Sequence, residues 1–230
     1  MRHIAVIPAR GGSRRLPKKN ILEFMGKPMI AWTIEAAQAT DLFDRILVST
    51  DSAEIAAVAR SYGATVPFLR SRAYDDHTPV SEATCATLEQ CAEELGEEFD
   101  LVTQLMANTP LRTADDICSA LQHFLAGSAP AQISCFAFGW MNPWWSVTLD
   151  PQGTPTHLFP DALAQRSQDL PKLYCPTGAV WIARTEALLA ARTFHCPGHR
   201  FFPMFWQSAV DIDDDEDLAI AQAVFNLRSA

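Results

Sequence analysis

The chain has 230 residues, 48% of them hydrophobic, and its 18 Lys and Arg against 27 Asp and Glu give a net charge of −9. This composition excludes a largely disordered chain, and the length suits one domain, or one domain with a small lobe. No apolar run is long enough for a membrane span or a signal peptide, and the acidic balance argues against general nucleic-acid binding. We therefore expect a soluble cytoplasmic protein that binds neither membrane nor nucleic acid.

The charged residues are segregated along the chain. Five basic residues lie within positions 10–19, and six acidic residues lie within positions 211–217. Runs of like charge are usually solvated surface segments, but they also form binding sites for ions of the opposite sign. This polarity is the feature that a functional hypothesis has to explain.

Apolar runs and helix-like segments alternate along the chain, beginning with a strand at Ile4–Ile7 whose continuous apolar character predicts burial on both faces. Further strands are predicted at 45–50, 65–68, 100–106, 132–138, 179–182 and 208–211. Helices are predicted at 28–39, 51–62, 80–95, 113–125, 185–192 and 215–225. This alternation indicates an α/β fold with a parallel sheet and helices on both faces.

The segment 139–172 interrupts this alternation. It is rich in Trp, Pro and polar residues, has no clear helix, and places Trp140, Trp144 and Trp145 close together. Such an insertion forms an extended hairpin lobe, a lid or an oligomer contact. We therefore expect a single domain over 1–230 with one protruding insert, whose tryptophans favour a dimer contact over a purely local cluster.

The six cysteines form no C-x-x-C pair, and no histidine spacing completes a zinc pattern. In a chain without a secretion signal, free and mostly buried thiols are the expectation. We therefore predict neither a disulfide framework nor a structural zinc ion.

The basic segment follows the first predicted strand and contains two glycines. Gly11 and Gly12 permit positive φ and a close approach of the backbone to a ligand, and successive N–H groups in such turns bind anions. Arg and Lys side chains add charge-assisted hydrogen bonds to phosphate oxygens, and ligands of α/β proteins bind where strands end. The segment matches neither the P-loop nor the G-x-G-x-x-G pattern. A polyphosphate site is favoured over a solvated basic loop.

The acidic segment begins with Asp211-x-Asp213 at the end of the predicted strand 208–211. Alternation in an extended chain directs both carboxylates to one side, where a cation would relieve their repulsion. Mg²⁺ takes one or two carboxylates together with phosphates and waters. The alternative is that the segment is only a helix N-terminus, which is our interpretation for Asp214–Asp217.

The segment Pro8–Asn20 resembles the N-terminal signature of the acylneuraminate (CMP-nonulosonic acid) cytidylyltransferases, with Arg14 in place of the usual Lys. The resemblance continues in the expected order over nearly the whole chain, at 26–30, 48–51, 109–112, 166–171 with Tyr174, and 210–213. Any one of these matches is weak, but together they make the resemblance specific.

The resemblance implies a three-layer α/β/α Rossmann-like nucleotide-diphospho-sugar transferase fold with a mostly parallel sheet and a dimerisation lobe at 139–172. It implies Mg²⁺-dependent transfer of CMP from CTP to the anomeric hydroxyl of a nine-carbon keto sugar acid, with release of pyrophosphate, by a homodimer whose lobe completes the neighbouring active site. The implied nucleotide-binding residues are Arg10, Gly11, Arg14, Lys19, Asn20, Arg70 and Ser81. The implied acceptor-binding residues are Gln104, Arg166, Gln168 and Tyr174. Asp211 and Asp213 are the implied metal ligands, and Arg10, Lys19 and Asp211 the implied catalytic residues.

Two stretches depart from the typical sialic acid members. The usual Gln-Pro-Thr is replaced by Met106–Asn108, and the usual Asn-Gly-Ala by Thr177–Ala179. Because both stretches border the acceptor pocket in the family, we expect a legionaminic- or pseudaminic-type acid rather than N-acetylneuraminate, with a slight lean to the pseudaminic branch.

Three other functions compete with this one. The first is cytidylyl transfer to 3-deoxy-manno-octulosonate, and the second is a non-catalytic nucleotide-sugar-binding protein. The third is a glycosyltransferase of similar fold, which is disfavoured because its metal-binding Asp-x-Asp normally lies mid-chain.

Overall fold

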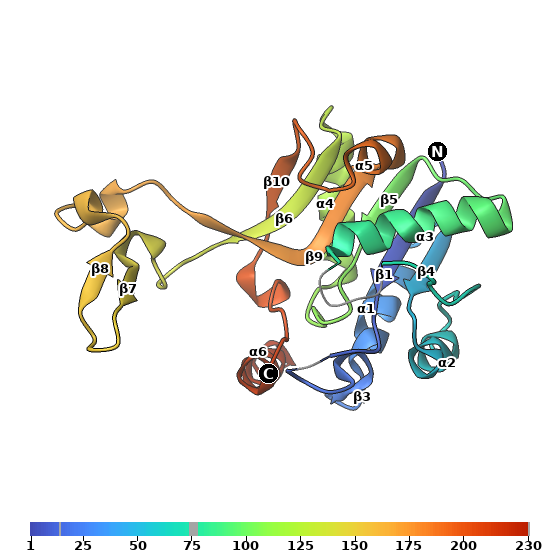
Figure 1. The fold of residues 1–230 in the computed structure, drawn as a ribbon, viewed down its shortest axis with the longest axis horizontal. Coiled ribbons are helices and arrows are strands. Elements are labelled where there is room, and N and C mark those ends of the chain that lie inside the picture. The colour runs from blue at the N-terminus through green and yellow to red at the C-terminus, as the bar shows by residue number, and fades with distance from the viewer. Residues whose placement is uncertain (14, 74–77, 230) are drawn as a thin grey trace.

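A computed structural model describes residues 1–13, 15–73 and 78–229, with the side chain of residue 229 excepted. Its centre is a six-stranded sheet of order β10-β6-β9-β5-β1-β4 (Figure 1). The strands are β1 (His3–Pro8), β4 (Arg45–Ser49), β5 (Leu101–Gln104), β6 (Ala131–Ala137), β9 (Tyr174–Arg184) and β10 (Arg200–Pro203). Five of them run in one direction, and β9 runs against its neighbours β5 and β6. The predicted mostly parallel sheet is confirmed.

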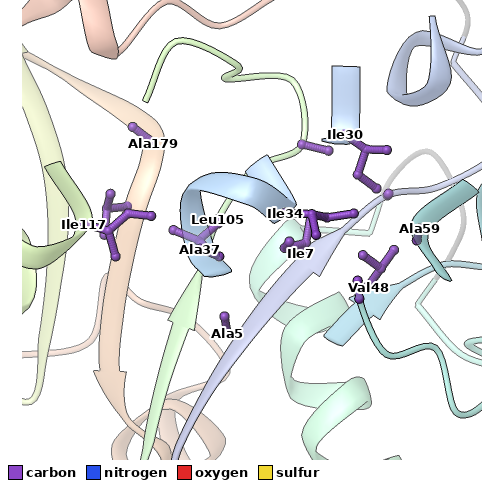
Figure 2. Packing of buried hydrophobic residues seen from close by; sticks show 14 of the residues in the cluster. Ala5, Ile7, Ile30, Ile34, Ala37, Val48, Ala59, Leu105, Ile117 and Ala179 are labelled. Atoms are coloured by element: carbon purple, nitrogen blue, oxygen red, sulfur yellow. The ribbon is translucent and has the colours of Figure 1, made fainter. Parts of the chain in front are cut away.

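Helices cover both faces of the sheet because residues of each central strand alternate between two apolar layers. In β1, Ala5 and Ile7 face one layer, and Ile4 and Val6 face the other. The first layer contains α1 (Met29–Gln38), α2 (Ala53–Ser61) and α4 (Ala114–Leu125), and Figure 2 shows part of it. The second layer contains α3 (Val80–Leu95) and α5 (Thr185–Ala191). The last helix, α6 (Asp215–Ser229), packs in a third, smaller cluster around Phe24 and Trp32.

The segment between β6 and β9 forms a lobe that projects far from the sheet (Figure 1). It contains the antiparallel pair β7 (Val147–Leu149) and β8 (Pro155–His157), and the 3₁₀ helices Pro143–Trp145, Pro160–Ala162 and Ser167–Asp169. Two extended arms join it to the sheet. Outside the lobe, short pieces include the pair β2 (Glu23–Phe24) and β3 (Lys27–Pro28) and the 3₁₀ helices Lys19–Ile21 and Trp206–Ser208.

The predicted strand at 65–68 is wrong. Thr65 makes a single bridge to Leu47, with hydrogen bonds Val48 N–H to Thr65 O and Thr65 N–H to Ile46 O. Pro67 has no N–H with which to continue the ladder, so no strand forms.

The predicted strand at 208–211 is also wrong. The N–H groups of Ser208 and Ala209 bond to the preceding turn at Phe205 and Trp206 instead of to a neighbouring strand. Among the strands of the six-stranded sheet, β10 was not predicted; it is a four-residue edge strand that ends in a proline. Its brevity gives it no recognisable alternation.

The antiparallel direction of β9 follows from the absence of a crossover helix in the lobe. Parallel neighbours need a long crossover, whereas β6 and β9 are joined through the lobe as the two arms of a large hairpin.

The six predicted helices are present with ends shifted by a few residues. All six cysteines are free, as predicted. No helix in the described part of the chain has both the length and the apolar character of a membrane span.

Candidate nucleotide site

A cavity of about 610 Å³ lies where β1 and β5 end. Its wall is built from segments that are distant in sequence: the N-terminal basic segment, residues 70–73 and 78–83, the turn after β5, and the start of the acidic segment. In sheets of this kind, ligands usually bind at the edge formed by the carboxyl ends of the parallel strands. The two oppositely charged segments noted in the sequence therefore face a single cavity.

The basic and acidic segments are in direct contact. Lys19 Nζ lies 2.6 Å from Asp213 Oδ1, and Arg15 donates to Asp213 Oδ2. Burial would raise the pKa of Asp213, but the hydrogen bond and charge of Lys19, together with Arg15, outweigh it and lower that pKa. Asp213 is therefore a stable carboxylate that holds two cations at the cavity wall.

Asp211 lies beside Asp213 on the same wall but makes no such ion pair among the described residues. It keeps accessible surface at the cavity, yet the surrounding protein displaces much of the bulk water around its carboxylate. This burial, with the negative charge of Asp213, raises the pKa of Asp211 to about 6, although Lys19 acts in the opposite sense. Asp211 therefore presents to the cavity a carboxylate that forms no ion pair of its own among the described residues.

The basic segment is held in place by its own backbone contacts. The Gly11 N–H donates to Asp51 Oδ1 at 2.8 Å, and Asn20 Nδ2 donates to the carbonyl of Arg10 at 3.0 Å. A Cβ at Gly11 would lie 3.1 Å from Ser52 Cβ, so glycine permits the close approach to α2. Neither Gly11 nor Gly12 adopts the positive φ that glycine permits, whereas Lys18 is in the left-handed conformation with φ of 55°.

Arg70 is buried at the cavity wall, with 4% of its surface exposed. Its Nη1 donates to Ser49 O and Ser49 Oγ, both at 2.9 Å. Burial, together with the nearby charge of Arg10, lowers the pKa of its guanidinium below the usual value, although the charge of Asp51 acts in the opposite sense. A buried cation next to a second cation favours an anionic ligand.

The structure brings six of the predicted site residues to this wall and places others elsewhere. Arg10, Lys19, Asn20, Arg70, Asp211 and Asp213 line the cavity. Gly11 lies next to them in the basic segment. Ser81 and Gln104 are buried and do not line it, and Gln104 Oε1 accepts a hydrogen bond from Thr84 Oγ1 at 2.7 Å. Arg14 lies outside the described residues.

The predicted acceptor residues of the lobe lie away from the cavity of their own chain (Figure 1). Arg166 is exposed and pairs with Asp169 at 2.7 Å, and Gln168 lies in the same 3₁₀ helix. Tyr174, at the start of β9, lines a different cavity of about 490 Å³ together with Phe205 and Trp206. A single chain therefore does not bring these residues to the nucleotide residues.

Further residues, which are not among the implied site residues, also contribute to the site. Arg15, Met106 and Asn108 line the cavity, and Asp51 holds Gly11. Asn108 Nδ2 donates to Asp213 Oδ1 at 3.3 Å and to Ile212 O at 3.1 Å, which ties the turn after β5 to the acidic segment. Asp51 and Asn108 each come shortly after a strand end, and this position was the available signal.

Comparisons with known proteins identify the family of the chain. The sequence pattern of a family described as cytidylyltransferase matches residues 4–171. The chain is 31% identical over 229 residues to a pseudaminic acid cytidylyltransferase of Campylobacter jejuni, covering 99% of this chain and 98% of that one. It is 33% identical over 234 residues to a CMP-N,N'-diacetyllegionaminic acid synthase of Legionella pneumophila, with the same coverage of both chains.

The fold is shared with a CMP:2-keto-3-deoxy-manno-octonic acid synthetase whose structure was solved with CTP. The TM-score is 0.73 and the identity 18%, over 99% of this chain and all of the other. The predicted Rossmann-like fold is confirmed. The chain therefore belongs to the cytidylyltransferase family, and it is a nucleotidyltransferase, as the family resemblance predicted.

Proposed function

We propose that the protein transfers CMP from CTP to the anomeric hydroxyl of a nonulosonic acid and releases pyrophosphate. The observation that carries this proposal is the single cavity in which Arg10, Arg15, Lys19 and Arg70 face the carboxylates of Asp211 and Asp213. The two relatives that match along almost their whole length support the acceptor class, since their names specify pseudaminic and diacetyllegionaminic acids.

The cations account for the nucleotide half of the reaction. The acceptor hydroxyl attacks the α-phosphorus, the bond to the bridging oxygen of the β-phosphate breaks, and negative charge grows on the departing pyrophosphate. Lys19 and Arg15 are held in place by Asp213, so they stabilise this charge without reorganising. Arg70, fixed by Ser49, adds a buried positive charge to the same wall.

We propose that Mg²⁺ binds at Asp211 and Asp213. No group of three or more His, Cys, Asp or Glu side chains in the described part of the chain could hold a metal ion. Two hard carboxylates beside a phosphate site nevertheless fit Mg²⁺, which takes its remaining ligands from phosphates and water. Asp211 supports this site because it faces the cavity and forms no ion pair among the described residues. When bound, Mg²⁺ supplies charge neutralisation at the reacting phosphate.

We further propose that the protein works as a homodimer whose lobe completes the acceptor site of the second subunit. The lobe exposes large apolar side chains that include Trp140 (87% exposed), Met141 and Leu149. Exposed apolar surface of this kind marks an interface. Arg166 offers a cation for the acceptor carboxylate but does not line the cavity of its own chain.

Co-expression of two inactive chains tests the exchanged lobe. Asp213→Asn removes a cavity carboxylate and Arg166→Ala removes a lobe cation, so a mixed dimer contains one intact site if the lobe acts on the second subunit. Random pairing of equal amounts then restores about a quarter of the wild-type activity, because half of the dimers are mixed and each has one good site. No recovery above the single variants would refute the exchange.

The direct test of function is a panel of keto sugar acids with CTP and Mg²⁺, read by pyrophosphate release. We expect turnover with at least one nonulosonic acid and none with Asp213→Asn. Turnover with the eight-carbon 3-deoxy-manno-octulosonate alone would move the assignment to that acceptor. CTP binding without turnover of any acid would refute the enzyme proposal.

We also propose a cytoplasmic location. The six free thiols support it, because cysteines stay reduced there.

A further inference from the structure

Met106 stands out in the turn that follows β5. Within residues 101–112, all of which the structure describes, every other residue is buried, and Met106 keeps accessible surface. This surface forms part of the cavity wall. A long apolar side chain is thus presented at a site whose neighbours are mostly charged or polar.

The backbone of Met106 is fixed on both sides. Its N–H donates to the carbonyl of Gly178 on β9 at 3.2 Å. Its carbonyl accepts from Thr33 Oγ1 and from Arg112 Nη1, both at 3.3 Å. The same Arg112 nitrogen donates to Ala179 O at 2.8 Å, so a fully buried arginine joins this turn to β9.

The side chain of Met106 is fixed by Gly178. A Cβ at Gly178 would lie 2.5 Å from Met106 Cγ and 3.3 Å from Met106 Cβ, so only glycine leaves room for this packing. From the other direction, Gln104 Nε2 lies 3.9 Å from Met106 Sδ, and Thr84 holds the Gln104 amide. The Met106 side chain is therefore held in a fixed position in the cavity wall by its neighbours.

The location of Met106 points to the acceptor and not to the leaving group. In-line transfer places the attacking hydroxyl opposite the departing pyrophosphate, which the cations of the basic segment bind. Met106 lies two residues before Asn108, whose side chain is bonded to Asp213 of the proposed Mg²⁺ site. The turn after β5 contributes Met106 and Asn108 to the cavity lining and no cation, since the buried Arg112 does not line the cavity.

We propose that Met106 determines acceptor specificity by presenting a rigid apolar surface to a position of the nonulosonic acid that lacks a hydroxyl group. The inference rests on the proposed function. A hydroxyl that faced the thioether would lose its hydrogen bonds to water without replacement, whereas a methyl group or hydrogen would pack against it. Discrimination of this kind is worth about tenfold or more in kcat/KM.

The test uses pairs of nonulosonic acids that differ by one hydroxyl, one pair for each position. For one pair, the wild type is expected to prefer the acid without the hydroxyl by about tenfold or more in kcat/KM. Met106→Gln, which has similar length and offers hydrogen bonds, should remove or reverse that preference, and the apolar control Met106→Leu should keep it. The proposal is overturned if an active Met106→Gln enzyme keeps the wild-type kcat/KM ratio for every pair of acids. This holds whether or not the KM for CTP changes.

A double-mutant cycle tests the packing itself. Gly178→Ala should lower the thermal stability and the acceptor preference when Met106 is present, and should have much less effect on stability in a Met106→Ala background, where the added methyl has room. An equal loss of stability in both backgrounds would show that Gly178 does not hold the Met106 side chain in place.

These results separate the two proposals. Turnover of any nonulosonic acid by the wild type upholds the proposed function, whatever the Met106 variants show. Absence of turnover with every acid overturns both.

Discussion

The buried His3 on β1 makes the folded protein sensitive to mild acid. His3 is 5% exposed, and its Nε2 lies 2.8 Å from Thr103 Oγ1 on β5. Burial lowers the pKa of His3 from 6.5 to about 4, although the charge of Asp44 acts in the opposite sense. The unfolded chain therefore takes up a proton at a higher pH than the folded protein does.

The sign and size of the effect follow from this difference. Stability is fully present above about pH 6.5 and is lost as the pH falls toward about 4, because the unfolded state binds more protons in that window. At pH 5 the two pKa values give a loss of about 2 kcal/mol relative to pH 8, with a limit of about 3 kcal/mol below pH 4.

Chemical denaturation at pH 8 and pH 5 measures this effect in the wild type and in His3→Gln. Carboxylates titrate in both proteins and cancel in the comparison. We expect the wild type to lose about 2 kcal/mol more than the variant between the two pH values. An equal loss in both proteins would show that His3 does not carry the effect.

Three further predictions concern the site, a helix and the lobe. Asp213→Asn should reduce Mg²⁺-dependent pyrophosphate release by at least about a hundredfold while the far-ultraviolet circular dichroism stays native, and retention of activity would contradict the metal proposal. Thr113→Ala removes the capping box that Thr113 forms with Asp116 at α4, and should cost about 1 kcal/mol in denaturation with kcat unchanged, whereas Thr113→Ser should keep most of the stability. Trp140→Asp places a charge on the most exposed tryptophan of the lobe and should shift sedimentation toward the monomer; an unchanged sedimentation coefficient at several concentrations would argue against the lobe as an interface.

Local signals in the sequence determined most of the fold. The apolar run at Ile4–Ile7 predicted a strand buried on both faces, and both apolar layers meet on it. Ser52 and Thr113 mark the starts of α2 and α4 because their hydroxyls accept from the N–H groups of the first turn. These signals act between residues a few positions apart, so a single sequence displays them.

The chemistry of the nucleotide half was also predictable. The basic segment, Arg70 and Asp211-x-Asp213 were each identified before the fold was known, and all of them face one cavity. Residue type and position after the first strand were sufficient for the basic segment, and the Asp-x-Asp spacing was sufficient for the two carboxylates, whereas Arg70 was indicated by the family resemblance.

Only the tertiary structure decided how distant segments pair. The antiparallel β9, the edge strand β10, the ion pair of Lys19 with Asp213 and the packing of Met106 on Gly178 all join residues far apart in the chain. The two charged segments of the sequence proved to be one site, held together by Asp213. Such contacts depend on the order and direction of the strands, a property of the whole sheet that no local pattern of residues carries.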